Sequence, residues 1–416
     1  MKILNFGSCN IDYVYSLDHI VKAGETETTG GMSVFPGGKG LNQSIALSRA
    51  GAAVCHAGCI GEGGDFLRDL LEENGVDTAF LKTVSEKNGH AIIQVSREGE
   101  NSIFLYPGSN ECLTHAQINE TLSHFSAGDL LVLQNEVNAL GYLVEAAYRR
   151  GLQIILNPSP YNEKIRQLDF EMLSYLVLNE VEAADITGCA SSEESLAFFH
   201  ARYPRLSVML TLGRRGCLYQ DAKQCLSHGS FRVNAVDTTA AGDTFTGYFV
   251  AGIAEGLPMG DILKQASCAA AISVSRMGAA PSIPNKAEVL CALPAMELSR
   301  IDEKRNGTEQ TIELYLDECL PTACLSGLAS TLGYSEPYTA QLVKELTGRG
   351  FCEQVQERRL RRAASLLMNE ELSVGEIIRT VGYENQSFFR RAFRTLYGMN
   401  PLEYRKTYRK GEKRHD

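Results

Sequence analysis

The segment Asp237–Gly247 joins two threonines and a run of small residues to a second aspartate, Asp243. Phe245, Phe249 and Ile253 recur at helical spacing from the end of this segment, which predicts a helix that begins within it. The amides and positive dipole end at a helix N-terminus favour an anion such as a transferring phosphoryl group. Asp243, in the opening turn, could then accept the proton of an attacking hydroxyl. The alternative is that Asp243 only caps the helix.

A second segment, Pro36–Gln43, is a glycine-rich turn that leads into the small-residue run Ser44–Ser48. It is not a P-loop, because Lys39 is followed by glycine where that motif has serine or threonine. Glycines here would let backbone amides and the Asn42 side chain approach a polyhydroxylated ligand. A purely structural turn fits the pattern as well.

The elements that would position these segments alternate short apolar runs with helical patterns up to about residue 290. This alternation predicts an α/β domain with a largely parallel sheet. The apolar runs include Ile3–Phe6, Leu130–Leu133, Ile154–Leu156, Leu176–Leu178 and Val208–Leu210.

Polar residues follow these runs, where a parallel sheet gathers the carboxyl ends of its strands. Ligands of open α/β sheets bind beyond those ends, so we expect the polar residues to converge on one crevice. They are Asn10, Asp12, Glu136, Asn157, Asn179, Glu182, Thr211 and Gly213.

Two further segments, Glu25–Val34 and His90–Tyr106, have the pattern of antiparallel strands. A small sheet that projects from the domain could serve as a lid over the crevice or as a dimer contact. An ordinary edge hairpin is the alternative.

Together these segments resemble the ribokinase or PfkB carbohydrate kinase family over residues 1–295. Gly38 and Asn42 match the first family signature, and Asp237–Gly247 matches the second without a gap. The resemblance implies a three-layer αβα domain with a small β-sheet lid, and transfer of phosphate from ATP to a sugar hydroxyl.

The resemblance also implies a role for individual residues. Asp243 is similar to the catalytic base, and Ala240, Ala241 and Gly242 to the anion hole. The sugar contacts implied are Asn10, Asp12, Gly38, Lys39, Asn42 and Glu136. Nucleotide contacts would come from Asn179, Thr211, Gly213, Gly216 and Gly242, and Glu182 would hold magnesium through water. The two loops that enclose potassium would contain Asp237, Thr239, Arg276, Gly278 and Ser282.

The implied substrate is ribose, ahead of deoxyribose, a ketohexose or a nucleoside. Ribokinases combine an Asn-x-Asp start with Gly-Gly-Lys-Gly and a glutamate at a strand end. This chain has all three, at Asn10–Asp12, Gly37–Gly40 and Glu136.

Residues 296–310 lack an apolar period, which marks a linker, and residues 311–416 have helical patterns throughout. Two helix-turn-helix patterns occur there. The first is Leu325–Pro337 with a following helix Tyr338–Thr347, and the second is Leu372–Tyr383 with a following helix Asn385–Tyr397. In both, a glycine permits the tight turn before the recognition helix.

These units resemble the AraC-type DNA-binding domain over residues 311–409, and the second unit matches more closely than the first. Helical spacing would direct Thr339, Gln341 and Lys344 toward one major groove, and Asn385, Gln386, Arg390 and Arg391 toward another. A helical oligomerisation or scaffold module is the alternative.

The charge is divided unevenly along the chain. Residues 1–310 hold 24 Lys+Arg and 36 Asp+Glu, whereas the remainder holds 16 and 14. An acidic first part argues against nucleic-acid binding there. No long apolar run or signal peptide is present and the twelve cysteines lack paired spacing, so we expect a cytoplasmic protein with reduced thiols.

Three hypotheses follow from these patterns. The first is an active sugar kinase that also regulates transcription as a homodimer. The second is a sugar-sensing regulator with a non-catalytic kinase fold, and the third a kinase with a vestigial tail. The first is preferred because Asp243 and the anion-hole residues are intact.

Overall fold

The structure is a computed structural model that describes residues 1–97, 101–298, 311–316, 319–347, 349–367, 372–383 and 385–409. The chain divides into two compact units, Met1–Arg300 and Ile301–Asp416. The predicted linker, 296–310, lies outside the described residues from residue 299 onward. Among the described residues, every helix is too short or too polar to cross a membrane.

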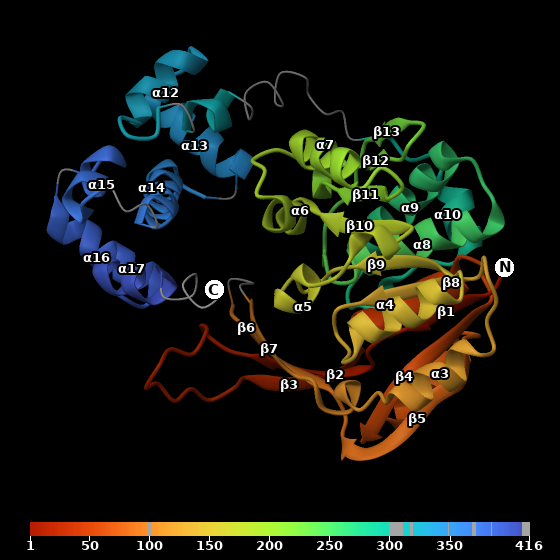
Figure 1. The fold of residues 1–416 in the computed structure, drawn as a ribbon. Helices are drawn as coiled ribbons and strands as arrows, with labels where there is room; N and C mark the ends of the chain where they lie inside the picture. Colours follow the sequence, from red (N-terminus) through yellow and green to blue (C-terminus); the bar gives the residue numbers. More distant parts are fainter. Residues whose placement is uncertain are drawn as a thin grey trace. The chain divides into compact units, whose positions relative to one another are not determined.

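The first unit is built on one nine-stranded sheet with the order β13-β12-β11-β10-β9-β8-β1-β4-β5 (Figure 1). Pairing is parallel from β11 through β5, and β12 and β13 continue it antiparallel. The strands are β1 Ile3–Phe6, β4 Val54–Glu62, β5 Asp77–Lys87, β8 Leu130–Gln134, β9 Gln153–Asn157, β10 Tyr175–Asn179, β11 Ser207–Thr211, β12 Cys217–Gln220 and β13 Cys225–His228. The predicted α/β fold and the five apolar strands are confirmed.

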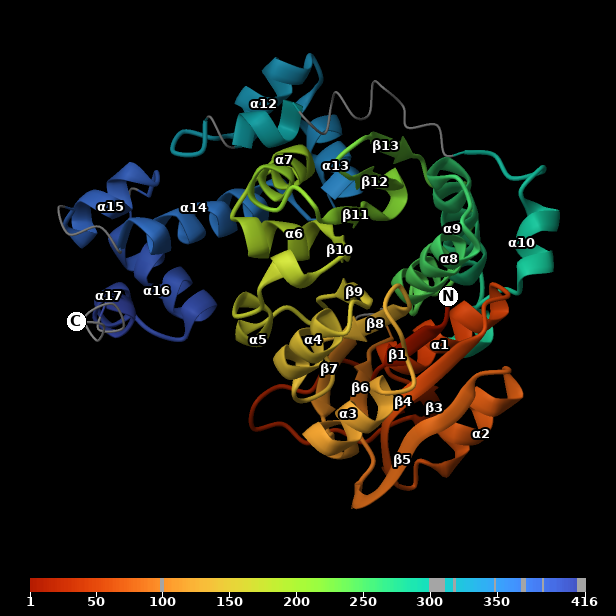
Figure 2. The ribbon, with the colours of Figure 1, turned by 45° about the vertical axis from the view of Figure 1, so that its right-hand side comes forward.

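Two apolar cores cover the two faces of this sheet. Successive strand residues point to opposite faces, so Ile3 lies in one core and Leu4 in the other. The first core packs under α1 Lys39–Arg49, α2 Asp65–Glu73, α8 Ala241–Glu255, α9 Met259–Val274 and α10 Lys286–Ala292. The second packs under α3 His115–Leu122, α4 Leu140–Arg149, α5 Glu163–Arg166, α6 Glu180–Thr187 and α7 Ser192–Arg202. The layers are therefore helix, sheet, helix (Figure 2).

A second sheet, with the order β3-β2-β6-β7, projects from the first unit (Figure 1). Its strands are β2 Asn10–Ser16, β3 Gly31–Gly37, β6 His90–Val95 and β7 Asn101–Tyr106. The expected strand at Glu25–Val34 is wrong in its first half. Residues 25–30 form a loop, in which Glu25 is held by hydrogen bonds with Lys22 and His19. The sheet also gains β2, which pairs parallel with β6.

The second unit is all helical in its described part. Its named helices are α12 Leu325–Leu332, α13 Glu336–Thr347, α14 Phe351–Leu367, α15 Val374–Thr380, α16 Gln386–Tyr397 and α17 Pro401–Arg409. Two separate small cores support it, one around Val343 and one around Phe389, and α14 contributes to both. The helix expected from Tyr338 begins at Glu336 instead. Pro337 is tolerated there because the first helical turn has no partner for the N–H that proline lacks.

Candidate functional site

Asp243 lies where the sequence predicted it, in the first turn of α8. Ala240 is the N-cap of this helix with φ 60°, a left-handed conformation that costs energy for any residue but glycine. A Cβ added to Gly242 would meet no atom within 4 Å, so the space before the helix is open. The first backbone amides of α8 therefore face an open space beside the Asp243 carboxylate.

The carboxylate of Asp243 is buried and is held by two side chains of α1. Asn42 Nδ2 donates to Oδ2 at 3.1 Å, and Gln43 Nε2 donates to Oδ1 at 2.9 Å. Asn42 Oδ1 is itself buried with no protein partner. The sequence indicated a role for Asn42 but not for Gln43, whose only signal was its place next to Asn42 in the glycine-rich segment.

Asp243 lines a cavity of about 200 Å³ with most of the residues predicted for phosphate chemistry. The predicted residues in its lining are Lys39, Asn179, Glu182, Thr211, Ala240, Gly242 and Asp243. Sequence analysis assigned no role to five further lining residues, Ser159, Val177, Leu178, Thr238 and Thr246. Asn157, expected in the crevice, lines the cavity as well.

Lys39 lines this cavity and lies near three carboxylates. Burial lowers the pKa of its ammonium group, but attraction to the carboxylates outweighs burial and leaves the pKa above its ordinary value. The three are Asp243, Glu136 and Glu182. Lys39 is therefore charged at neutral pH, and it offsets the repulsion among the acids that surround it.

Glu136 follows β8 and links that strand to the glycine-rich turn. Its carboxylate accepts the Lys39 backbone N–H at 3.0 Å and the Ser8 hydroxyl. Burial raises the pKa of Glu136, although Lys39 and these hydrogen bonds oppose the increase. Glu136 is outside the cavity lining, so it reaches the cavity through Lys39.

Asn10 and Asp12 lie on β2, at the base of the small sheet. Asn10 Oδ1 accepts from Asn110 Nδ2 at 2.7 Å. Burial and then the nearby Glu136 raise the pKa of Asp12 to about 7. Gly37 makes room for Asp12, because a Cβ there would lie 2.1 Å from Asp12 Oδ2.

Gly38 begins α1 with φ 94°, and a Cβ there would lie 2.9 Å from the Asn10 backbone nitrogen. The conformation and the space both require glycine. The predicted sugar contacts from β2 and from the glycine-rich turn are thus brought together.

Asn179 and Glu182 form a capping box at the start of α6. Asn179 Oδ1 accepts the Glu182 N–H at 2.9 Å, and Glu182 accepts the Asn179 N–H at 3.0 Å and the Ser159 hydroxyl. These contacts fix the Glu182 carboxylate at the edge of the cavity.

The predicted nucleotide turn follows β11. Thr211 donates to Leu178 O at 3.3 Å, and Gly213 and Gly216 have φ 54° and 98°. A Cβ at Gly216 would lie 2.0 Å from His228 O, so this turn packs closely against the end of β13.

The two predicted potassium loops are joined by Asp237. Its carboxylate accepts from the Thr239 amide and hydroxyl at 2.9 and 2.6 Å and from the Gly278 amide at 2.9 Å. Burial alone would raise the pKa of Asp237, but these hydrogen bonds outweigh it and lower the pKa. Arg276 instead pairs with Glu288, and Ser282 bonds to Ala279 O and to the Ser273 hydroxyl.

The predicted DNA contacts of α13 need one correction. Gln341 and Lys344 are exposed, but Thr339 is fully buried, so its expected place on the groove-facing surface is wrong. On α13, Thr339 faces the core of the second unit, and the preceding residue, Tyr338, is exposed in its place. Sequence analysis missed Tyr338.

On α16, Gln386, Arg390 and Arg391 are exposed as expected. Asn385 is exposed too, but its side chain is the N-cap of α16 and accepts from the amides of Ser387 and Phe388. Its predicted contact with DNA would have to compete with this role.

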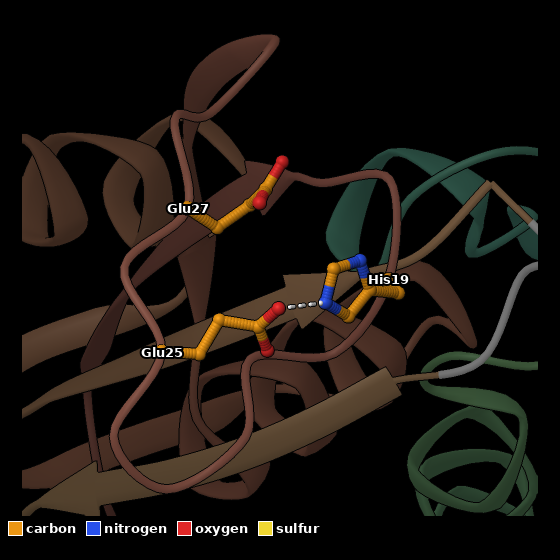
Figure 3. Close-up of side chains that lie close together, drawn as sticks. All are labelled: His19, Glu25 and Glu27. Carbon is orange, nitrogen blue, oxygen red and sulfur yellow. Dashed lines mark hydrogen bonds and ion pairs between the residues drawn. The ribbon is translucent and has the colours of Figure 1, made fainter.

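One cluster outside the cavity has the residue types of a metal site, His19 with Glu25 and Glu27 (Figure 3). It lies in the loop between β2 and β3. His19 Nε2 and Glu25 Oε1 are 2.8 Å apart, and Glu25 also accepts the Lys22 N–H at 3.0 Å. Hydrogen bonds within a surface loop account for the contacts of Glu25 with His19 and Lys22.

Comparison with known proteins agrees with this geometry. Residues 1–286 match the model of the pfkB family carbohydrate kinases. The chain is 35% identical to the ribokinase of Haemophilus influenzae over 294 residues, which is 68% of this chain and 95% of that protein. It is 33% identical to the ribokinase of Bacillus subtilis over 292 residues, 69% of this chain and 98% of that protein.

The chain belongs to the pfkB family of carbohydrate kinases. The ribokinase of Cryptococcus neoformans, solved with ADP, has a TM-score of 0.62 and 34% identity and covers 70% of this kinase and 98% of that chain. Residues 328–407 of the kinase match a helix-turn-helix domain, which confirms the AraC-type resemblance. The chain is thus a ribokinase-type sugar kinase with a C-terminal DNA-binding domain.

The raised pKa of Asp12 makes the stability of the unliganded kinase depend on pH. The folded chain keeps this proton up to pH about 7, whereas the unfolded chain loses it near the ordinary value of 3.8. The folded chain therefore loses stability progressively as the pH rises from 3.8 to about 7, because the unfolded chain releases this proton over that range and the folded chain does not. We expect Asp12→Asn to raise the melting temperature at pH about 8 and to leave it unchanged near pH about 4.

The matched control is Asp18→Asn, which removes an exposed carboxylate just after the end of β2 that pairs with Arg97 at 2.8 Å. Its effect on the melting temperature should be small at both pH values. An equal effect of Asp12→Asn at both pH values would contradict the raised pKa.

Proposed function

We propose that this kinase transfers the γ-phosphoryl group of ATP to D-ribose and forms ribose 5-phosphate. The observation that carries the proposal is the buried Asp243 carboxylate at the open start of α8, held by two amides of α1. Relatives named ribokinase favour ribose. A deoxyribokinase of Salmonella typhi, 29% identical, makes deoxyribose the second candidate.

In this reaction Asp243 acts as general base. The ribose hydroxyl gives its proton to the Asp243 carboxylate while its oxygen forms a bond to the γ-phosphorus. The bond between that phosphorus and the β,γ-bridging oxygen breaks, and ADP leaves. Ala240, Ala241 and Gly242 surround the transferring group, where amides of the helix start stabilise its growing negative charge.

Sugar hydroxyls would be bound by the predicted contacts around the cavity. Asp12 and Glu136 accept hydrogen bonds from hydroxyls, and Asn42 Oδ1 has an unused acceptor for one. Lys39 donates to a sugar oxygen and screens the charge of the incoming phosphate. Asn10 and Gly38 complete the set.

The nucleotide would lie along Asn179, Thr211, Gly213, Gly216 and Gly242. Glu182 suits magnesium, which prefers oxygen ligands and keeps several waters, because its carboxylate is fixed at the edge of the same cavity as Asp243. Magnesium, when bound, neutralises phosphate charge. Potassium would lie between the loops that Asp237 joins, near Thr239, Arg276, Gly278 and Ser282, with backbone oxygens as ligands. Such a kinase would work in the cytoplasm.

Replacement of the base tests this proposal. We expect Asp243→Asn to lower kcat for ribose-dependent ADP release by about 10²- to 10⁴-fold, because no carboxylate then accepts the proton. Calorimetry should still detect ribose binding. The matched control is Asp261→Asn, an exposed aspartate in the first turn of α9, which should keep full activity. Full activity of Asp243→Asn would refute the assignment.

We also propose that the second unit reads a DNA sequence and that sugar or nucleotide changes its affinity for that sequence. The exposed Gln341 and Lys344 on α13 and Gln386, Arg390 and Arg391 on α16 would lie in successive major grooves. Linkage requires that DNA then alters ligand affinity by the same factor. Equal DNA affinity with and without sugar and nucleotide would refute this coupling.

The contribution of α16 to DNA binding can be measured from the salt dependence of the affinity. Binding is measured with a duplex selected from a random pool. Arg390→Ala and Arg391→Ala should each weaken binding, and each should reduce the slope of log K against log salt concentration by about one. Arg202→Ala, an exposed arginine of α7 in the first unit, is the control and should leave both unchanged. If the α16 variants behave like the control, α16 is not the DNA-binding surface.

Finally, we propose that the small sheet pairs with a second copy of the chain. Its edge strands β3 and β7 expose large apolar side chains, an arrangement typical of an interaction surface. They are Met32, Val34, Phe35, Ile103, Phe104, Leu105 and Tyr106. We expect sedimentation velocity to show a dimer that Phe104→Asp dissociates and that the control Leu290→Asp, at an exposed position of α10, leaves intact. A monomeric wild-type chain would refute the pairing.

A further inference from the structure

Asp243 is contacted by an amide that does not line the cavity. Gln43 is fully buried on α1, and its Nε2 donates to Asp243 Oδ1 at 2.9 Å and to Asn157 Oδ1 at 3.4 Å. Asp243 and Asn157 line the cavity, whereas Gln43 is absent from its lining. Gln43 therefore reaches the base from the protein side and not from the space in which substrates would lie.

The orientation of the Gln43 amide is imposed by a chain of buried amides. Gln134 Nε2 donates to Gln43 Oε1 at 2.7 Å and to Asn5 Oδ1 at 2.9 Å. Because an amide nitrogen only donates and an amide oxygen only accepts, Gln134 must turn its nitrogen toward these two oxygens. Gln43 must then turn its oxygen to Gln134 and its nitrogen to Asp243.

Asn5 anchors the far end of this chain. Its Nδ2 donates to Gly40 O and to Ser44 Oγ, both at 2.8 Å, so that β1 is tied to the same helix that holds Gln43. Asn5, Gln43 and Gln134 all have no exposed surface. Gln134 Oε1 is buried without a partner in this arrangement. A turned Gln43 amide would nevertheless point its nitrogen at Gln134 Nε2 and its oxygen at the Asp243 carboxylate, which makes the observed orientation of Gln43 the stable one.

We propose that Gln43 is a positioning residue for phosphoryl transfer, which orients the Asp243 carboxylate toward the acceptor hydroxyl. The inference rests on the proposed role of Asp243 as base. A hydrogen bond donated to a carboxylate favours its charged form, and a general base must be both ionised and aimed at the proton that it takes. Asn42 holds the other oxygen, so the two amides together fix the carboxylate plane.

The test replaces Gln43 with methionine, which keeps the volume and removes the donor. We expect kcat for ribose to fall about tenfold to a hundredfold because the base is misplaced. KM for ribose should change less than about twofold, since no sugar contact is removed. The acid limb of the kcat pH profile should move to higher pH, because the carboxylate that acts as base loses a donated hydrogen bond. If the wild type is active and Gln43→Met has the same kcat and the same pH profile, the inference is overturned.

The control is Gln354→Met, which removes a buried glutamine of the second unit that donates to Thr347. It reproduces the loss of a buried amide without touching Asp243, so kinase parameters should stay at wild type. A role of Gln43 in stability alone would lower the melting temperature of Gln43→Met but leave kcat per folded molecule unchanged.

A second variant, Gln43→Glu, guards against poor folding of the first. The new carboxyl group, when protonated, can donate to Asp243 as the amide did, whereas the ionised group repels Asp243. We expect residual activity at acid pH that falls as pH rises, opposite to wild type. A wild-type pH profile in this variant would contradict the inference.

A readout independent of turnover separates this inference from the proposed function. If the wild type phosphorylates no sugar, the proposed function fails. Carbon-13 NMR of labelled aspartate, with Asp243 assigned by its loss in Asp243→Asn, still compares the wild type with Gln43→Met. A titration midpoint that rises in Gln43→Met supports the inference, and an unchanged midpoint overturns it.

Discussion

The close packing of α1 against α8 is the contact on which the site depends. A Cβ on Gly247 would lie 2.4 Å from Ala46 Cβ, so the helices approach as they do only because position 247 is glycine. That approach brings Asn42 and Gln43 of one helix onto Asp243 of the other. Two segments that lie some two hundred residues apart in the sequence thereby form one carboxylate site.

Charge balance is the second constraint on this site. Several carboxylates lie around the cavity, and together they hold the pKa of Lys39, which lies among them, above its ordinary value. Burial, and then the nearby Glu136, nevertheless raise the pKa of Asp12, so the unliganded chain retains part of the cost of burying these acids. A site that accepts hydrogen bonds from several hydroxyl groups needs these carboxylates as acceptors, and the folded chain loses stability because it holds them there.

The sequence predicted the fold of the first unit because apolar runs and turn residues are local signals. It also placed Asp243 at a helix start, since Phe249 and Ile253 fix the helical phase. It did not predict Gln43, because the partners of that residue come from other strands and helices. Nor did it predict the buried Thr339, because helical phase depends on which side meets the core.

One measurement tests the central claim that this chain carries out sugar phosphorylation as well as binding. The wild-type chain is incubated with ribose, ATP, magnesium and potassium, and ADP and sugar phosphate are quantified in the same samples while calorimetry records ribose binding. The account predicts one ribose 5-phosphate for each ADP formed. Ribose binding without either product would contradict it and would make the first unit a sensor for the DNA-binding domain.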